Sequence, residues 1–191
     1  MTITKSKKEK IIKKAENLFS RYNYNAVSLN DIAQQNKVTK AALYYHFKNK
    51  EDLFLSILKK AHKEISFSIN KIVNQPISTE EKVKKIILTV LDTKINQNYL
   101  TNLTVQKLSK NDKKLSKLIS ELKEESLKVI EPLMKEIIKS RNYPQETDPK
   151  ILSFFIMSSL KGYTIQKTCD GYAKWPAEQF ANEIINIIFR K

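Results

Sequence analysis

Apolar residues recur every three to four positions along most of the chain. In the first such stretch, where lysines occupy many of the other positions, they are Ile11, Ile12, Ala15, Leu18, Phe19 and Tyr22. This spacing gathers the apolar side chains on one face of an α-helix. No stretch sustains the alternation of apolar and polar residues that a half-buried strand requires. The pattern therefore indicates helices throughout.

Short polar breaks divide these amphipathic stretches into a series of expected helices. They cover approximately residues 7–22, 29–35, 40–47, 50–73, 79–91, 99–108, 112–140, 149–162 and 176–190. Only two glycines occur in the 191 residues, whereas sheets with tight hairpins usually need more turn glycines. We therefore predict an all-α fold.

Length and composition suit one large or two small helical domains with a substantial core, since 41% of the 191 residues are hydrophobic. The single cysteine, Cys169, cannot form an intramolecular disulfide and fits a reducing compartment. The N-terminus lacks an apolar signal region, and no window approaches the roughly 18 apolar residues of a membrane span. We expect a cytoplasmic protein without a membrane segment.

The chain carries a formal net charge of +15, which favours a polyanionic partner, either nucleic acid or an anionic membrane surface. Part of this charge could reflect a general richness in Lys, Asn and Ile. However, residues 1–60 contain 13 Lys and Arg against five Asp and Glu, and the remaining 131 residues contain 22 against 15. The concentration of charge at the N-terminus favours DNA as the partner.

Residues 28–47 contain signals for two short helices joined by a tight turn. Ser28 with Asp31 forms a capping signature for the first helix. Asn36 and Lys37 make the turn, and Thr39 can cap the second helix. This is the layout of a helix-turn-helix, whose second helix enters a groove of DNA.

The second helix must expose most of its residues. Leu43 and Phe47 fill its inward positions, so Tyr44 and Tyr45 cannot both be buried. An alternative is that the Tyr-Tyr-His-Phe run is simply core, but four successive residues cover the whole circumference of a helix. The residues expected on the exposed surface are Lys40, Ala41, Ala42, Tyr44, Tyr45 and His46.

These residue types suit contact with duplex DNA. Lys40 can donate to O6 and N7 of guanine, and Ala41 and Ala42 allow a close approach to the groove and can touch a thymine methyl group. The polar ends of the Tyr-Tyr-His run suit phosphate oxygens. Further candidates for contact with the DNA backbone are Ser28, Asn30, Thr39, Lys48 and Lys50.

Several short motifs follow each other in a fixed order across this region. They are Asp-Ile-Ala at 31–33, Val-Thr-Lys at 38–40, Leu-Tyr-Tyr-His-Phe at 43–47 and Lys-Glu-Asp-Leu at 50–53. In order and spacing they resemble the TetR family of bacterial transcriptional regulators. The resemblance implies a DNA-binding domain over residues 5–65 and a helical effector-binding and dimerisation domain over residues 66–191.

The resemblance also implies roles for individual residues. Contacts with bases or the nearby backbone are implied for Asn30, Lys40, Ala41, Ala42, Tyr44 and His46. Phosphate contacts are implied for Ser28, Thr39, Tyr45 and Lys50. The sequence departs from the family at Lys37, where the family usually has glycine. This departure should be unfavourable, because a left-handed turn is more costly for lysine than for glycine.

Residues 66–191 resemble the family only in length and pattern. The resemblance implies a homodimer formed through the last two helices, here about 149–170 and 176–190, and a symmetric dimer matches a palindromic operator. The apolar residues of these helices could serve that interface or face the core of their own protomer. They are Ile151, Leu152, Phe155, Ile156, Leu160, Phe180, Ile184 and Ile188.

A small-molecule effector is implied as well, because effector pockets of the family lie among the middle helices. Candidate wall residues, each of which could instead be plain core, are Phe67, Tyr99, Phe154, Tyr163 and Trp175. The run from Tyr44 to Phe54 looks closest to members that sense hydrophobic drugs, although it belongs to the DNA-binding part.

Neither an enzyme nor a metal protein is expected. The sequence shows no glycine-rich phosphate loop and no compact set of acid, base and nucleophile, and His46, His62 and Cys169 lack metal-site spacing. We therefore predict a DNA-binding repressor, without cofactors, that a hydrophobic effector releases from a palindromic operator. The alternative is a basic helical protein that binds anionic membranes or partner proteins.

Overall fold

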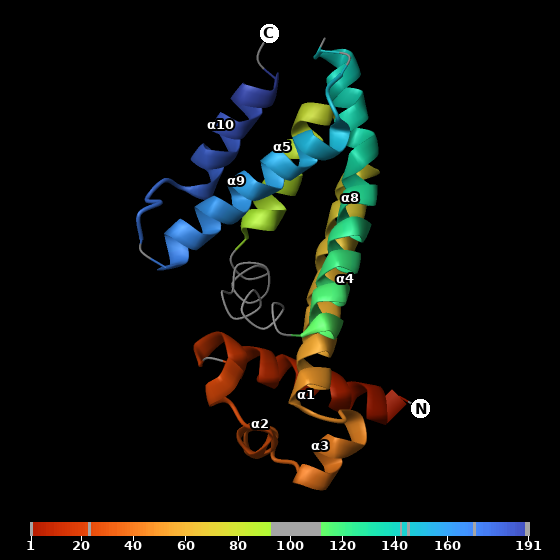
Figure 1. Ribbon diagram of the computed structural model, residues 1–191, viewed down its shortest axis with the longest axis vertical. Helices are drawn as coiled ribbons and strands as arrows, with labels where there is room; N and C mark the ends of the chain where they lie inside the picture. The colour runs from red at the N-terminus through yellow and green to blue at the C-terminus, as the bar shows by residue number, and fades with distance from the viewer. Residues whose placement is uncertain are drawn as a thin grey trace. The chain divides into compact units, whose positions relative to one another are not determined.

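The computed structural model describes residues 2–22, 24–92, 112–141, 143–144, 146–169 and 171–189. Every regular element in these ranges is a helix, which confirms the all-α prediction (Figure 1). The chain forms two compact units, one of residues 1–62 with 97–118 and one of residues 63–96 with 119–191. The helix expected at residues 99–108 lies outside the described residues.

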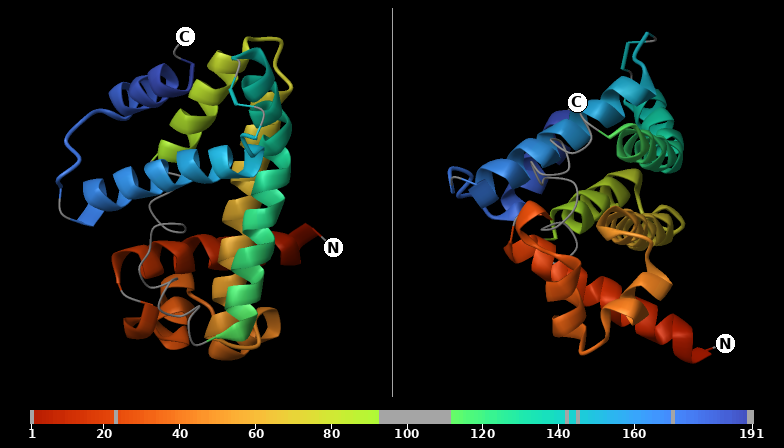
Figure 2. Two further views of the ribbon diagram at one scale, coloured as in Figure 1. Left: turned by 45° about the horizontal axis from the view of Figure 1, so that its top comes forward. Right: turned by 60° about the horizontal axis from the view of Figure 1, so that its bottom comes forward.

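The N-terminal unit combines the longer helix α1 (Thr2–Arg21) with shorter helical segments. They are the 3-10 helix η1 (Tyr24–Ala26), α2 (Leu29–Asn36), α3 (Lys40–His46) and the first part of α4 (Lys50–Val73). Figure 2 shows α2 and α3 in orange, joined by one tight turn. These two helices are the predicted helix-turn-helix.

The core of this unit contains the apolar stripe predicted for the first helix. Ile11 and Ala15 of α1 are buried together with Ile32 of α2 and Leu53 of α4. The prediction is wrong for Tyr22, which is 57% exposed. Helix α1 ends at Arg21, so the residue after it no longer follows the helical spacing.

Three aromatic rings hold η1 between α1 and α4. The Tyr24 ring lies 5.3 Å from the Phe19 ring and 4.9 Å from the Phe54 ring, measured between centroids. Phe19 and Phe54 meet edge to face at 5.7 Å. Such pairs contribute roughly 0.5–1.5 kcal/mol each beyond their buried area, so they fix the path of the chain before α2.

The C-terminal unit has a second core of its own. It is built from the later part of α4, α5 (Thr79–Leu91), α8 (Lys113–Ser140) from residue 119, α9 (Pro149–Cys169) and α10 (Ala177–Phe189). Helix α5 packs against both α9 and α10. Ile87 of α5 and Ile137 of α8 are fully buried, so the apolar faces predicted for these helices meet in this core.

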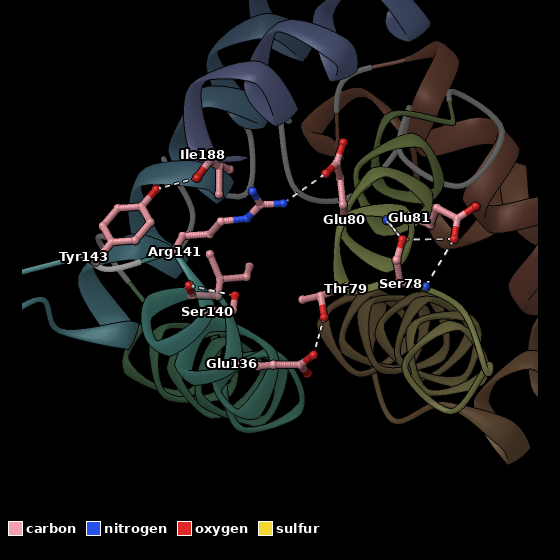
Figure 3. Close-up of polar contacts among 10 residues, drawn as sticks. Ser78, Thr79, Glu80, Glu81, Glu136, Ser140, Arg141, Tyr143 and Ile188 are labelled. Carbon is pink, nitrogen blue, oxygen red and sulfur yellow. Dashed lines mark hydrogen bonds and ion pairs between the residues drawn. The ribbon is translucent and has the colours of Figure 1, made fainter. Parts of the chain in front are cut away.

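Polar contacts join the ends of α5, α8 and α10 (Figure 3). Ser78 and Glu81 form the capping box that starts α5. Two links follow the end of α8: the Arg141 guanidinium lies 3.5 Å from a Glu80 carboxylate oxygen, and the Tyr143 hydroxyl donates to a backbone carbonyl of α10. These links fix the end of α10 against the rest of the unit.

Candidate nucleic-acid interface

The N-terminus of α2 is fixed by reciprocal hydrogen bonds between Ser28 and Asp31. The Asp31 carboxylate accepts the Ser28 backbone N–H at 2.7 Å, and the Ser28 hydroxyl oxygen accepts the Asp31 N–H at 3.2 Å. Two hydrogen bonds from Ser28 lower the pKa of the Asp31 carboxyl group. The larger effect comes from the Ser28 backbone N–H and the smaller one from its hydroxyl. The predicted capping signature is confirmed, and Asn30 is exposed on the first turn of the helix.

The turn between α2 and α3 depends on Lys37, whose backbone is left-handed with φ 54° and ψ 43°. The Val38 N–H donates to the Ala33 carbonyl at 3.1 Å, so α2 ends in a Schellman-type turn. Glycine adopts this conformation at no steric cost. Among the described residues, no other non-glycine residue has a positive φ. The left-handed conformation, which is more costly for lysine than for glycine, is therefore present at Lys37.

Helix α3 separates its side chains into a buried and an exposed set, as predicted. Leu43 and Phe47 are 0% and 1% exposed, whereas Tyr45 is 78% exposed and Tyr44 is 46% exposed. The other exposed residues of this helix are Lys40, Ala41 and Ala42. The exposed set combines one cation, two small residues and two phenols on a rigid support, which is the chemistry of a helix that contacts a DNA groove.

Thr39 and His46 lie at the two ends of α3. The Thr39 hydroxyl accepts the Ala42 N–H at 3.1 Å and caps the helix, as predicted. His46 was expected on the exposed surface, but it is half-buried. Its ring lies beside those of Tyr45 and Phe47, with centroids 5.1 and 6.3 Å away. This packing leaves only part of the imidazole accessible to DNA.

Two lysines that follow α3 differ in their surroundings. Lys48 is exposed, and its backbone N–H donates to the Asp52 carboxylate at 3.1 Å. Lys50 is half-buried, and its ammonium donates to the carbonyls of Tyr24 and Val27 at 2.8 and 2.9 Å. Burial lowers the pKa of Lys50. The surroundings of Lys48 thus suit the predicted phosphate contact better than those of Lys50 do.

Helix α1 brings further positive charge to the helix-turn-helix. The Lys8 ammonium lies 5.2 Å from the centroid of the Phe47 ring at the end of α3. Lys14 donates to the carbonyl of Gln35 near the end of α2. The sequence showed a lysine-rich face on α1 but could not place it beside α2 and α3. The basic surface is therefore wider than the predicted site.

The C-terminal unit encloses a small apolar cavity between α5, α8 and α9. Its lining includes Ile86, Ile87, Leu133, Met134, Ile156 and Leu160. A volume of about 20 Å³ has room for a water molecule, whereas sites for drug-sized ligands have roughly 300–1,000 Å³. The one polar side chain in the lining, that of Ser153, donates its hydroxyl hydrogen to the Pro149 carbonyl at 2.8 Å. The cavity is therefore apolar in character and too small for a drug-sized ligand.

None of the described residues predicted as effector walls borders this cavity. Phe67, Phe154 and Trp175 are exposed, and Tyr99 lies outside the described residues. Tyr163 is buried, but it donates its hydroxyl to a carbonyl 2.7 Å away in the loop before α10. The prediction favoured aromatic residues, whereas the cavity has aliphatic walls. Contacts of the five residues with an effector stay predictions.

Helix α9 is apolar on two opposite sides. Ile151, Phe154 and Phe155 are more than half exposed, and Ile187 of α10 is exposed as well. Leu152 and Phe180, also predicted for the dimer interface, are half-buried. For a third group the alternative prediction is confirmed, since these residues belong to the core of their own unit. They are Ile156, Leu160, Ile184 and Ile188.

The chain has a basic helix-turn-helix, which a second helical unit follows in the sequence. This organisation places it in the class of helix-turn-helix DNA-binding proteins. Residues 11–57 match the family model described as bacterial regulatory proteins, tetR family. The match identifies these residues as a DNA-binding domain of the TetR type, as the resemblance of the motifs implied. A match to a family of regulatory proteins agrees with the expectation that the chain is not an enzyme.

The HTH-type transcriptional regulator QacR of Staphylococcus aureus is 47% identical to the chain over 51 residues. This similarity covers 27% of the chain and 27% of QacR, so the chain spans about a quarter of the length of this relative. The likeness is therefore confined to the DNA-binding part.

Solved structures resemble the whole chain. FadR from Bacillus subtilis, in complex with stearoyl-CoA, superposes with a TM-score of 0.77 at 18% identity, covering 95% of this chain and 97% of FadR. AibR, in complex with isovaleryl coenzyme A and operator DNA, gives a TM-score of 0.72 at 17% identity, covering 96% of this chain and 98% of AibR. At these identities the likeness shows the fold alone, and the fold agrees with the predicted architecture.

Proposed function

We propose that the chain is a ligand-responsive transcriptional repressor that binds a palindromic DNA operator as a homodimer. The observation that carries this proposal is the exposed surface of α3. Leu43 and Phe47, on the opposite side of this helix, are buried and anchor it in the core. A short helix supported in this way and exposing Lys40 at its first turn suits insertion into the major groove. Residues 5–65 form the DNA-binding domain in this proposal, and residues 66–191 bind the effector and the partner protomer.

The proposed contacts with DNA follow the exposed residues of the helix-turn-helix. Base edges or the nearby backbone are contacted by Asn30, Lys40, Ala41, Ala42, Tyr44 and His46. Phosphates are contacted by Ser28, Thr39, Tyr45 and Lys48. The lysines of α1 add to the positive field, which speeds association with a polyanion. The chemistry of α3 supports this assignment, because small residues near the groove floor are combined with donors at the edges.

A homodimer in this proposal forms through the exposed side of α9 and the neighbouring surface of α10. Ile151, Phe154 and Phe155 form an apolar patch of the kind that marks protein interfaces. Ser158 and Gly162 continue this side at helical spacing, and a Cβ atom added at Gly162 would meet nothing within 4 Å. Small residues beside large apolar ones allow a partner helix to approach closely.

The effector in this proposal carries a hydrophobic acyl chain, and an acyl-CoA thioester is the specific candidate. The aliphatic cavity between α5, α8 and α9 supports an apolar ligand. FadR and AibR, which share the fold, were solved with acyl-CoA ligands. A cavity of about 20 Å³ cannot hold an acyl chain, so binding requires these helices to separate. A ligand that binds only the separated state shifts the dimer toward it, and α3 of the two protomers then no longer fits successive major grooves.

Selection from a random duplex DNA library with the purified full-length chain tests this function. We expect an enriched inverted repeat that a dimer binds. Stearoyl-CoA and isovaleryl-CoA should then be titrated against the complex, with coenzyme A alone as the control. An enriched inverted repeat released by one of the acyl thioesters would support the proposal in full. The absence of any sequence preference would contradict it.

The rival function, binding to an anionic membrane, gives a different result in the same preparation. No helix in the described parts of the chain has the length and apolar character needed to cross a bilayer, so this rival concerns binding at the surface. It predicts sedimentation with vesicles of phosphatidylserine and no enriched DNA motif. The regulator predicts the opposite pair of results.

A further inference from the structure

We infer that Lys50 is an internal positioning residue for DNA binding and not a ligand of phosphate. Its ammonium, on the first turn of α4, donates hydrogen bonds to the segment before α2. These hydrogen bonds determine the position in which the N-terminus of α2 presents Ser28 to DNA. The inference rests on the proposed function, because it assigns a role within DNA recognition.

The geometry around the Lys50 ammonium leaves little capacity for an external anion. An ammonium has three N–H donors, and two of them point to the carbonyls of Tyr24 and Val27, at 2.8 and 2.9 Å. The nitrogen also lies 4.2 Å from the centroid of the Tyr24 ring, within the range of a cation–π contact. Lys48, two residues earlier, is exposed.

The position of Lys50 is unfavourable for α4 itself. It is the first residue of that helix, where the positive end of the helix dipole disfavours a cation. The local cap comes from Asn49, whose side-chain oxygen accepts the Asp52 N–H at 2.8 Å. The start of α4 therefore does not favour a lysine at this position, whereas the contacts with the two carbonyls do.

Those carbonyls belong to the segment that sets the start of α2. Val27 is buried and directly precedes Ser28, the N-cap residue of α2. Tyr24 is held in turn by the rings of Phe19 and Phe54. Without the ammonium, the Val27 carbonyl would lose a partner within the protein, and the N-cap would be free to shift. Removal of the charge should therefore alter how α2 meets DNA without removing a phosphate contact.

The variant Lys50→Met tests this inference, because it removes the ammonium and keeps most of the apolar stem. Lys48→Met is the matched control at an exposed lysine. Affinity should be measured over a range of salt concentrations, for the duplex selected with the wild-type chain and for a scrambled duplex of equal length. The measuring temperature should be one at which circular dichroism shows all proteins folded.

Lys50→Met should lose about tenfold in affinity for the selected duplex, the equivalent of one charge-assisted hydrogen bond, and less for the scrambled duplex. Its salt slope should equal that of the wild type. Lys48→Met should weaken both complexes similarly and lower the slope by about one. A lower slope for Lys50→Met would identify a phosphate ligand and overturn the inference. Unchanged affinities with only a lower melting temperature would overturn it as well, since Lys50 would then serve stability alone.

Amide hydrogen exchange tests, without DNA, whether the hydrogen bonds of Lys50 fix the start of α2. The N–H groups of residues 27–31 should exchange faster in Lys50→Met than in Lys48→Met, and equal exchange would contradict the inference. If Lys50→Met does not fold, Lys50→Gln replaces it in both experiments. If no duplex is selected at all, the proposed function fails, and the exchange result still decides whether Lys50 fixes the start of α2.

Discussion

Leu43 and Tyr44 are neighbours in the chain, yet Leu43 has no exposed surface and Tyr44 is 46% exposed. The first anchors α3 in the core of the N-terminal unit, and the second lies on the surface proposed to meet DNA. Stability and DNA binding of this helix can therefore be changed separately, by substitutions one residue apart.

Leu43→Ala should lower the free energy of unfolding by about 2–5 kcal/mol, because it leaves a cavity in a closely packed core. Tyr44→Phe keeps the ring and removes only an exposed hydroxyl, so stability should change by less than about 0.5 kcal/mol. Urea denaturation followed by circular dichroism measures both. The same Tyr44 variant should weaken binding to the selected duplex. Equal destabilisation by the two substitutions would show that α3 is not anchored as described.

Lys40→Ala should weaken binding by about 1–3 kcal/mol at one base pair of the operator, because lysine at the first turn of α3 is placed to donate to a guanine. Affinities for a set of duplexes with single base-pair changes would locate that position. Lys37→Ala, at an exposed lysine in the preceding turn, is the control. A uniform loss across all duplexes would assign Lys40 to phosphate.

Lys37→Gly should raise the free energy of unfolding by about 1 kcal/mol, because glycine adopts the left-handed backbone of this turn without steric cost. Lys37→Ala removes the same charge but keeps the strained Cβ, and it should not stabilise the protein. Thermal unfolding of the three proteins separates the backbone effect from the charge effect. Equal stability of the glycine and alanine variants would contradict the explanation.

Stability at acid pH should depend on the two capping carboxylates, Asp31 and Glu81. Hydrogen bonds from Ser28 and Ser78 hold their pKa values below the ordinary 3.8 and 4.5. A carboxyl group whose pKa is lowered by folding stabilises the protein above its unfolded pKa, and this contribution is lost as the pH falls through the folded pKa. Unfolding midpoints should therefore decrease as the pH drops below about 4.5.

Asp31→Asn isolates the contribution of α2 to this pH dependence. Its unfolding midpoint should fall less steeply below the ordinary Asp pKa of 3.8 than that of the wild type, because asparagine does not titrate. Glu146→Gln, at an exposed loop position, is the control and should follow the wild-type curve. An Asp31→Asn curve parallel to the wild type would refute the assigned role of the cap.

The starts of the helices and the two sides of α3 could be predicted because the information for them is local. Ser28 and Asp31 lie three residues apart, and so do Ser78 and Glu81, so both capping boxes are visible in the sequence. Contacts between distant segments are not. Lys50 meets carbonyls 26 and 23 residues earlier, and nothing near it in the sequence marks an internal role.

The cavity and the two sides of α9 show a second limit of the sequence. Aliphatic residues line the cavity, and the core contains many others like them, so no pattern distinguishes Ile87 or Leu160 as a wall. Helix α9 is apolar almost all round, and spacing alone could not decide which side faces its own unit. The structure separates them, with Ile156 buried and Phe154 71% exposed.

The exposed side of α9 makes the proposed dimer testable without disturbing the core. Phe154→Glu places a charge in the apolar patch, and light scattering should then detect monomers, because an unpaired carboxylate cannot be buried at an interface without a large cost. Phe67→Glu is the matched control, since Phe67 of α4 is exposed to a similar degree, 66%. The control should remain dimeric, and both variants should keep the wild-type helical content.

Loss of the dimer should also abolish tight binding to an inverted repeat, because each protomer then meets a single half-site. Affinity of Phe154→Glu for a duplex with one half-site should match that of the wild-type protomer. A persistent dimer in the Phe154→Glu variant, or equal dissociation of both variants, would place the interface elsewhere. Truncation before α10 cannot replace this test, because Ile184 and Ile188 belong to the core, and their loss would unfold the unit.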